Sequence, residues 1–159
     1  MARILLVEDD GVLREDLGHK LRGWGHETDL ASDLQPAYEA LRRRRPQLIL
    51  SDIILPSGTG FDLLRHVGEK QFGLMDTPVI LISSLDDQPS IHYGELCGAA
   101  DYLIKPIDYA VLKELVDQRL HGNKNWLIRT LLSDLTPWRA GRRSDKREPV
   151  QRSVFGMRR

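Results

Sequence analysis

Four short hydrophobic runs, each followed at once by a chemically reactive side chain, constrain the fold of this chain more than any other feature. The runs occupy residues 4–7, 48–51, 79–82 and 102–104. Runs of this length that are rich in Ile, Leu and Val are typical of strands in a parallel sheet covered on both faces. With a further strand near 28–31, they predict five β–α units and a three-layer α/β/α fold. The order of the strands does not follow from this periodicity.

The segments between these strands carry apolar residues at helical spacing, which predicts five helices. We expect them near residues 12–21, 33–44, 63–68, 87–96 and 108–120, with Asp33 and Asp108 as the N-terminal caps of the second and fifth helices. Four consecutive arginines, Arg42, Arg43, Arg44 and Arg45, fall at the end of the second helix, where positive charge favours the helix dipole. A solvated helix end is favoured over a nucleic-acid contact as the interpretation of this run.

The distribution of charge divides the chain into two parts. Residues 1–121 carry 13 Lys and Arg against 20 Asp and Glu, whereas residues 122–159 carry 10 against 3. We therefore expect an acidic domain over 1–121 and a basic C-terminal extension over 122–159. Within the extension, apolar spacing predicts a helix at 126–135, and the composition after it is typical of a disordered tail.

Several classes of protein are excluded by composition. The single cysteine, Cys97, excludes an internal disulfide framework. No apolar stretch approaches the roughly 20 residues that span a bilayer, and the first strand begins too early to leave room for a secretory leader. We therefore expect a soluble cytoplasmic protein without membrane insertion. The five histidines show no metal-ligand spacing, and there is no Gly-rich phosphate loop of the Walker type.

Reactive side chains follow four of the predicted strands, and the carboxyl ends of parallel strands meet at one edge of a sheet. Asp9, with Glu8 beside it, and Asp52 supply oxygen ligands of the kind that Mg²⁺ prefers. Lys105 and Ser83 supply a mobile positive charge and a hydroxyl donor for phosphoryl oxygens. Any one of these acids alone could be a helix cap. Their conjunction predicts a magnesium and phosphate site.

These strand ends resemble the receiver domain of two-component response regulators. The resemblance covers about residues 2–121 and depends on four motifs, Glu8-Asp9-Asp10, the segment 51–60 around Asp52, Ser83-Ser84, and Lys105-Pro106. It implies a flavodoxin-like, doubly wound five-stranded sheet in the order 2-1-3-4-5. It also implies that Asp52 accepts a phosphoryl group from the histidine of a sensor kinase or a phosphotransfer protein.

The resemblance also implies a role for each residue of the site. Asp9 would ligate Mg²⁺ directly and Glu8 mainly through water, together with Asp52 and the backbone carbonyl of Ile54. Lys105 would pair with the phosphoryl group, and its peptide bond to Pro106 is usually cis in this family, a geometry tolerated only before proline.

The resemblance also implies a conformational switch that responds to phosphorylation, and two apolar residues beside the site bear on the lifetime of the phosphoryl group. Ser83 and Tyr102 resemble the family's switch pair, in which the hydroxyl moves toward the phosphoryl group and the ring takes the vacated space. The alternative for Tyr102 is a half-buried strand aromatic with its hydroxyl in water. Ile54 and Leu85 flank the site and are apolar, so they cannot orient an attacking water. We therefore hypothesise slow self-dephosphorylation.

The first interpretation of the output is a stand-alone receiver, not an enzyme, that acts on a downstream protein target. The 38 residues after residue 121 are too few for a winged helix or an enzyme domain. The expected contact surface is the face made by the fourth helix, fifth strand and fifth helix, and the same face would serve a phosphorylation-dependent homodimer. Candidate residues on it are Ile91, Tyr93, Glu95, Tyr102, Tyr109 and Lys113.

Two alternatives stay open. The chain could belong to a DNA-binding transcriptional regulator, either through the basic tail or through an output domain missing from this chain, since clustered positive charge attracts nucleic-acid phosphates. It could also be a small-molecule enzyme of flavodoxin-like shape, although an acidic edge that carries a lysine argues against a flavin phosphate there. The cognate kinase, the stimulus and the oligomeric state do not follow from the sequence.

Overall fold

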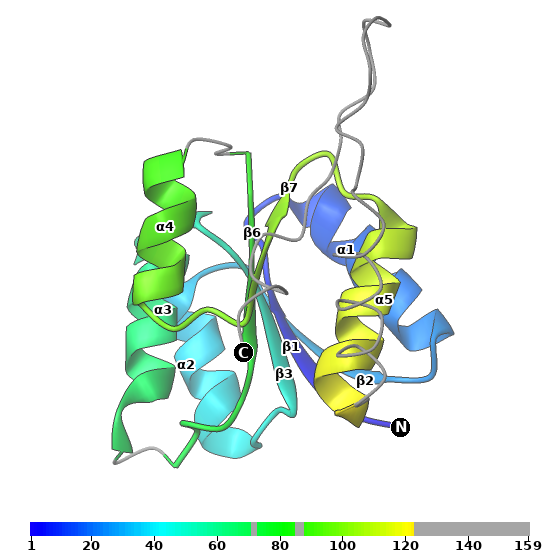
Figure 1. The fold of residues 1–159 in the computed structure, drawn as a ribbon. Coiled ribbons are helices and arrows are strands. Elements are labelled where there is room, and N and C mark those ends of the chain that lie inside the picture. The colour runs from blue at the N-terminus through cyan, green and yellow to red at the C-terminus, as the bar shows by residue number, and fades with distance from the viewer. Residues whose placement is uncertain (71–72, 85–87, 123–159) are drawn as a thin grey trace, which may run out of the picture.

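Five parallel strands form the central layer of the computed structural model, which describes residues 1–70, 73–84 and 88–122 (Figure 1). Their order across the sheet is β2-β1-β3-β6-β7, and each neighbouring pair is parallel. This is the predicted order 2-1-3-4-5, counted over the five long strands. The strands are β1 (Arg3–Val7), β2 (Glu27–Ala31), β3 (Leu48–Asp52), β6 (Val79–Ser83) and β7 (Asp101–Ile104).

Helices cover both faces of this sheet (Figure 1). On one face lie α1 (Gly11–Gly23) and α5 (Tyr109–His121). On the other lie α2 (Leu34–Arg43), α3 (Gly60–Gly68) and α4 (Gln88–Leu96). The five predicted helices and the three-layer arrangement are therefore confirmed.

Alternation along each strand divides the core into two hydrophobic clusters, because successive side chains of a strand point to opposite faces. In β1, Leu5 packs with the α2 and α3 side chains Leu41 and Leu63. Its neighbour Ile4 packs on the other face with Leu17 of α1. Every residue of β3 and β6 is buried, which explains why these strands read as unbroken apolar runs.

Side-chain caps fix where the helices begin. The carboxylate of Asp10 accepts hydrogen bonds from the N–H groups of Val12 and Leu13, at 2.9 and 3.0 Å, and so starts α1. Asp33 and Asp108 cap α2 and α5, as the sequence predicts.

A two-stranded hairpin separates β3 from α3. Its strands, β4 (Ile54–Leu55) and β5 (Gly58–Thr59), are antiparallel, and the sequence did not predict them. A capping box between Thr59 and Asp62 then begins α3. Gly60 passes so close to β3 that a Cβ atom there would lie 2.4 Å from the carbonyl oxygen of Asp52. Only glycine allows this approach, which holds the start of α3 against the end of β3.

An ion pair ties the last turn of α5 to the start of β7. The carboxylate of Asp101 is fully buried, and it accepts a hydrogen bond of 2.7 Å from Nε of Arg119. The same guanidinium donates to the carbonyl of Ala100 at 2.7 Å. Removing one partner of such a buried pair costs about 3–5 kcal/mol, because the other charge stays in the interior uncompensated.

Some predictions concern residues outside the described ranges. The proposed helix at 126–135, the tail that follows it, and Leu85 all lie there. The domain boundary at residue 121 remains a prediction. Within the described ranges, no helix combines the length and the apolar character that crossing a membrane requires.

Candidate functional site

The register of the sheet brings five of the predicted site residues to its carboxyl edge. Glu8 and Asp9 follow β1 directly, and Asp52 is the last residue of β3. Ser83 ends β6, and Lys105 follows β7. The paired positions of neighbouring strands, such as Asp52 with Ile82, stop at nearly the same level. Side chains that are far apart in sequence therefore converge where ligands of such sheets collect.

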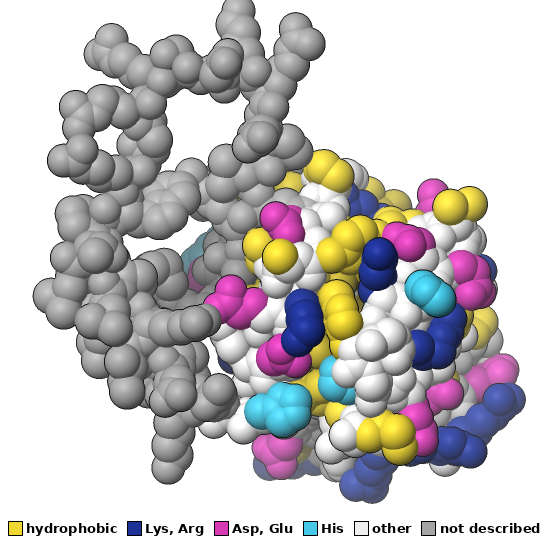
Figure 2. Space-filling view, turned by 90° about the vertical axis from the view of Figure 1, so that its right-hand side faces the viewer, with side chains coloured by type: hydrophobic (Ala, Val, Ile, Leu, Met, Phe, Trp, Pro, Cys, Tyr) yellow, Lys and Arg dark blue, Asp and Glu magenta, His cyan; other side chains and the backbone are white. Residues whose placement is uncertain are grey.

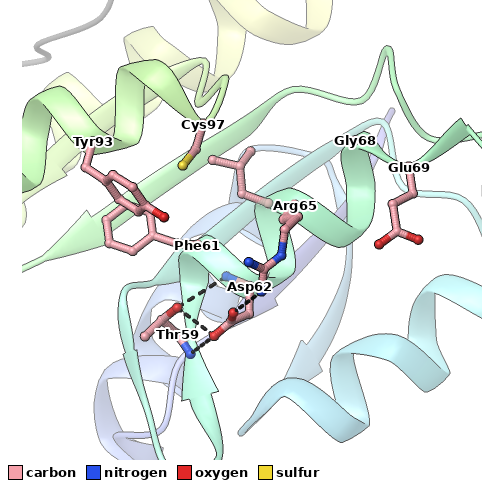
Figure 3. Close-up of a pocket in the computed structure, with 9 residues that line it drawn as sticks. Thr59, Phe61, Asp62, Arg65, Gly68, Glu69, Tyr93 and Cys97 are labelled. Atoms are coloured by element: carbon pink, nitrogen blue, oxygen red, sulfur yellow. Dashed lines mark hydrogen bonds and ion pairs between the residues drawn. The ribbon is translucent and has the colours of Figure 1, made fainter.

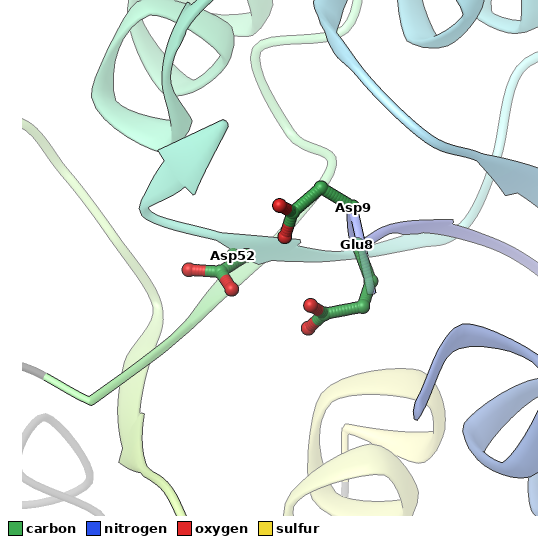
Figure 4. A group of neighbouring side chains, drawn as sticks. All are labelled: Glu8, Asp9 and Asp52. Carbon is green, nitrogen blue, oxygen red and sulfur yellow. The ribbon is translucent and has the colours of Figure 1, made fainter. Parts of the chain in front are cut away.

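Three carboxylates form a tight cluster at this edge (Figure 4). One oxygen from each of Glu8, Asp9 and Asp52 lies within 4.8 Å of the others. Glu8 and Asp52 are 1% and 5% exposed, whereas Asp9 is exposed. Carboxylates this close repel one another unless a cation lies between or beside them. The cluster has the oxygen ligands that Mg²⁺ prefers.

Glu8 is the most buried of the three acids. Its Oε2 atom is buried and accepts no hydrogen bond within the described part of the chain, although Lys105 Nζ lies 3.0 Å away. Burial raises the pKa of Glu8, and the negative charge of Asp52 adds to this, while Lys105 acts in the opposite direction. A buried oxygen with spare acceptor capacity fits a divalent cation in the cluster.

Lys105 is the positive charge that faces these acids. Its Nζ atom lies 2.5 Å from Asp52 Oδ2 and 3.2 Å from Glu8 Oε1. Burial acts to lower the pKa of Lys105, but its hydrogen bonds to Asp52 and Glu8 outweigh this and the pKa is raised. The ammonium form is therefore secured. The Lys105–Pro106 peptide bond is cis, as the resemblance implies.

Backbone and hydroxyl groups fix the position of Asp52. Its Oδ1 atom accepts a hydrogen bond of 2.9 Å from the N–H of Ile54. Ser51 donates its hydroxyl to the Asp52 carbonyl at 2.9 Å. The carboxylate is thus held on one side by the backbone of the hairpin and on the other by Lys105.

Arg14 supports the acidic cluster and was not found by sequence reasoning. Its Nη1 atom donates to the carbonyl of Glu8 at 2.7 Å and to that of Asp9 at 3.2 Å. These bonds fix the turn on which both carboxylates sit. Asp10, the third acid of the motif, caps α1 and is not one of the three clustered residues. An arginine one helical turn after an acidic triplet was the available signal.

The structure corrects the expected placement of Tyr102 and Ile91 on the contact surface, and it excludes the alternative that was left open for Tyr102. Tyr102 is 0% exposed, so it is neither a half-buried strand aromatic nor part of an exposed contact surface. Ile91 is also buried, and both pack in the cluster beneath α2, α3 and α4. Their side chains point inward because β7 and α4 each turn one face to the core. Tyr93, Glu95 and Lys113 are exposed, as predicted.

A separate pocket of about 710 Å³ lies between α3 and α4 (Figure 3). Phe61 and Tyr93 meet across it edge to face, with ring centroids 4.8 Å apart. Among the described residues that line it, Thr59, Asp62 and Arg65 form a hydrogen-bonded set on α3. The pocket contains none of the residues predicted for the phosphoryl and metal site, although Tyr93 is one of those predicted for the contact surface.

The order of the strands and the side chains at the carboxyl edge of the sheet define the class of protein. It is a flavodoxin-like α/β protein with a site at that edge that contains clustered carboxylates and a lysine. Residues 4–117 match the family model described as response regulator receiver domain, which covers more than half of the chain. The chain therefore belongs to the response regulator receiver domain family, of two-component signal transduction.

Curated relatives agree with this assignment. The chain is 33% identical over 112 residues to "Transcriptional regulatory protein AfsQ1" of Streptomyces coelicolor, covering 70% of this chain and 48% of that protein. It is 36% identical over 121 residues to "DNA-binding response regulator MtrA" of Mycobacterium leprae, covering 76% and 52%. The chain thus spans about half the length of these relatives. It is also 31% identical to "Protein PilH" of Pseudomonas aeruginosa, of which it covers 100%.

Solved structures show the same fold. The signal receiver domain of a signal transduction histidine kinase from Syntrophus aciditrophicus is 35% identical, with a TM-score of 0.71, over 78% of this chain and 93% of that one. The chemotaxis response regulator CheY4 of Vibrio cholerae is 27% identical, with a TM-score of 0.70, over 76% and 99%.

Proposed function

We propose that Asp52 accepts a phosphoryl group from the histidine of a sensor kinase or a phosphotransfer protein, in a reaction that requires Mg²⁺. The observation that carries this proposal is the position of the Asp52 carboxylate. It is buried at the carboxyl edge, clustered with Glu8 and Asp9, and 2.5 Å from the ammonium group of Lys105. Positioning and charge stabilisation are what phosphoryl transfer mainly requires of a protein.

Glu8, Asp9 and Asp52, with the backbone carbonyl of Ile54, would hold the Mg²⁺ ion. The spare buried oxygen of Glu8 supports this assignment. When bound, the ion would neutralise negative charge on the carboxylates and on the phosphoryl group. Arg14 would keep the backbone of Glu8 and Asp9 in place, because it bonds to both carbonyls.

The side chains of the site would share the transfer step. An Asp52 carboxylate oxygen attacks phosphorus, the phosphorus–nitrogen bond to the donor histidine breaks, and its electron pair stays on the histidine nitrogen. Lys105 Nζ, which now pairs with Asp52, would follow the charge onto a phosphoryl oxygen. The Ser83 hydroxyl would donate to another. This action assists the protein's own phosphorylation and makes the chain a signalling domain rather than an enzyme with a separate substrate.

The response to phosphorylation would pass through Ser83 and Tyr102 to the surface of α4, β7 and α5. Because the Tyr102 ring is already buried, the proposed switch is a shift of an internal ring toward Ser83, not its entry from solvent. The exposed side chains of Tyr93, Glu95 and Lys113 would then report that shift to a downstream protein or to a second phosphorylated copy. We place this signalling in the cytoplasm.

A second candidate function is control of transcription. It is favoured by two relatives, a transcriptional regulatory protein and a DNA-binding response regulator, each of which this chain covers over about half its length. In that case DNA would be bound by an output domain outside this chain or by the basic residues 122–159. The receiver chemistry would be the same.

Incubation with acetyl phosphate and Mg²⁺, followed by intact mass measurement, tests the first proposal. We expect the full chain to gain the mass of one phosphoryl group only when Mg²⁺ is present, and Asp52→Asn to gain none. Asp10→Asn is the matched control, since Asp10 is a nearby carboxylate that caps α1 outside the cluster. Labelling of Asp52→Asn at the rate of the unchanged chain would refute the proposal.

A further inference from the structure

Four arginines gather at the opposite, amino-terminal edge of the sheet. Arg42 and Arg43 end α2, Arg44 is its C-cap, and Arg45 leads toward β3. They line a pocket of about 320 Å³. We call this set the arginine pocket, and its described lining residues are Leu41, Arg42, Arg43, Arg44, Arg45, His66 and Leu74.

The positive charge of the arginine pocket is larger than the helix dipole of α2 and the neighbouring carboxylates can compensate. A helix C-terminus carries only about half a negative charge, which one cation compensates. Within the described part of the chain, only Arg43 of the four arginines lies within 4.0 Å of a carboxylate, with Glu39 at 3.7 Å. Both of those side chains are exposed, so the pair contributes little to stability. No carboxylate is among the described lining residues.

This concentration is an exception on an acidic domain. Residues 1–121 carry seven more acidic than basic residues. On the face shown in Figure 2, basic, acidic, histidine and hydrophobic side chains are interspersed over the described part of the molecule. Four adjacent cations around one hollow therefore form a local concentration of positive charge on a domain whose charge sum is negative.

The shape of the arginine pocket is partly fixed before any ligand binds. Arg45 Nη1 donates to the Gly73 carbonyl at 3.3 Å, and the backbone of Gly73 has φ of +64°. The positive φ favours glycine at this position, whereas the nearby Arg45 guanidinium is the flexible end of an exposed side chain and could move aside. Leu41 and Leu74 are almost fully buried, so the accessible lining comes mainly from the arginine side chains and His66. The His66 ring is stacked at a tilt on Tyr38, with centroids 4.4 Å apart.

We propose that the arginine pocket binds a phosphate-bearing small molecule of nucleotide size. Guanidinium groups match phosphate oxygens with paired hydrogen bonds, which lysine cannot do. The half-buried His66 ring, which is part of the lining, offers a surface for a flat organic group. The volume lies at the lower end of small-ligand pockets, about 300–1,000 Å³. Because α2 and α3 run from the Asp52 edge to this one, the ligand would not compete with phosphoryl transfer (Figure 1).

Calorimetric titration of the full chain with ADP and, separately, with inorganic pyrophosphate tests this proposal, in buffer without Mg²⁺. The triple variant Arg42→Gln, Arg44→Gln, Arg45→Gln should bind ADP about tenfold or more weakly than the unchanged chain. The matched control removes three described arginines that do not line the pocket, Arg3→Gln, Arg22→Gln and Arg65→Gln, and its affinity for ADP should stay within about twofold of that of the unchanged chain. Both variants should still be labelled by acetyl phosphate, which shows that they are folded.

The two ligands distinguish the sources of the phosphate. Tighter binding of ADP than of pyrophosphate would indicate that the natural ligand is a nucleotide. Equal binding of the two would indicate a simple polyphosphate. Both results agree with recognition of phosphate groups by the arginine pocket. Equal losses in the pocket and control variants would overturn the proposal, because they would indicate unspecific charge attraction. Absence of both ADP and pyrophosphate binding would also overturn it, and pocket-dependent binding of a short DNA duplex would then indicate a nucleic-acid contact.

Discussion

The two edges of the sheet differ in the sign of their charge and in how deeply that charge is buried. At the carboxyl edge, two of three clustered carboxylates are buried and one lysine pairs with them. At the amino edge, the four arginines are exposed around a hollow. Buried charges are tightly coupled and expensive to leave unpaired, whereas exposed ones are screened by water and salt. Substitutions should therefore have large, specific effects at the first edge and small effects on stability at the second.

The largest expected effect is on the rate of phosphorylation. Measuring this rate in one variant from each edge would sharpen the comparison between the two edges. Lys105→Met should slow labelling by acetyl phosphate and Mg²⁺ on the order of a hundredfold, because one preorganised positive group is lost from the transfer site. Labelling is followed by intact mass over time. The triple substitution in the arginine pocket should leave the rate within about twofold, since its residues lie at the other edge. Equal slowing in both variants would break the comparison.

The next effect concerns Mg²⁺ and stability. At a concentration a hundred times its dissociation constant, Mg²⁺ should raise the free energy of unfolding of the unchanged chain by about 2.7 kcal/mol. Asp9→Asn should lose most of this gain and, without Mg²⁺, should be slightly more stable, because repulsion among the carboxylates is relieved. Urea unfolding with and without the ion measures both. Asp10→Asn should keep the full gain, and the same loss there would contradict the assignment of ligands.

A smaller effect is expected on the lifetime of the phosphoryl group. Ile54 is the first residue of β4 in the hairpin and is 55% exposed, so an Asn side chain fits there without disturbing the core. Ile54→Asn should shorten the lifetime several-fold, because its amide can orient a water molecule toward phosphorus and isoleucine cannot. Loss of label after removal of acetyl phosphate gives the rate, and Ile54→Leu is the control. An unchanged or longer lifetime in the Asn variant would defeat the hypothesis of slow self-dephosphorylation.

The smallest effect concerns α3, which connects the two edges. Thr59→Ala removes one half of the capping box and should lower the free energy of unfolding by about 1 kcal/mol at neutral pH, while Thr59→Ser should change it little. Hydrogen bonds from Thr59 hold the pKa of Asp62 below its ordinary value of 3.8. The stability that the ionised Asp62 carboxylate contributes through these hydrogen bonds is therefore complete above pH 3.8. It is lost as the pH falls through the lower pKa that Asp62 has in the folded protein. Urea unfolding from pH 7 to pH 3 should show that the difference in free energy of unfolding between the unchanged chain and Thr59→Ala becomes smaller. A constant difference over this range would argue against the capping box.

The strands were predictable because β3 and β6 are buried on both faces, which leaves an unbroken apolar signal in the sequence. The caps at Asp33 and Asp108 were predictable for a similar reason, since a local hydrogen bond requires a local residue. The order of the strands came only from resemblance to a family. Non-local pairing leaves no periodic trace in a single sequence.

The features that were missed depend on three-dimensional neighbours. The hairpin strands β4 and β5 have two residues each, which is too short for an alternating pattern. The burial of Tyr102 depends on which face of the edge strand β7 carries α4, and four residues do not reveal it. The arginine run looked like a solvated helix end, because its pocket appears only when His66 and Leu74 are brought beside it.

The ion pair between Asp101 and Arg119 sets a physical limit on how short this domain can be made. The stretch that matches the family model ends at residue 117, two positions before the guanidinium that neutralises the Asp101 carboxylate. A fragment trimmed to that match would keep the acid in its interior and discard its counter-charge. The smallest stable unit is therefore defined by electrostatics rather than by sequence similarity, and expression of the isolated domain should retain α5 through His121.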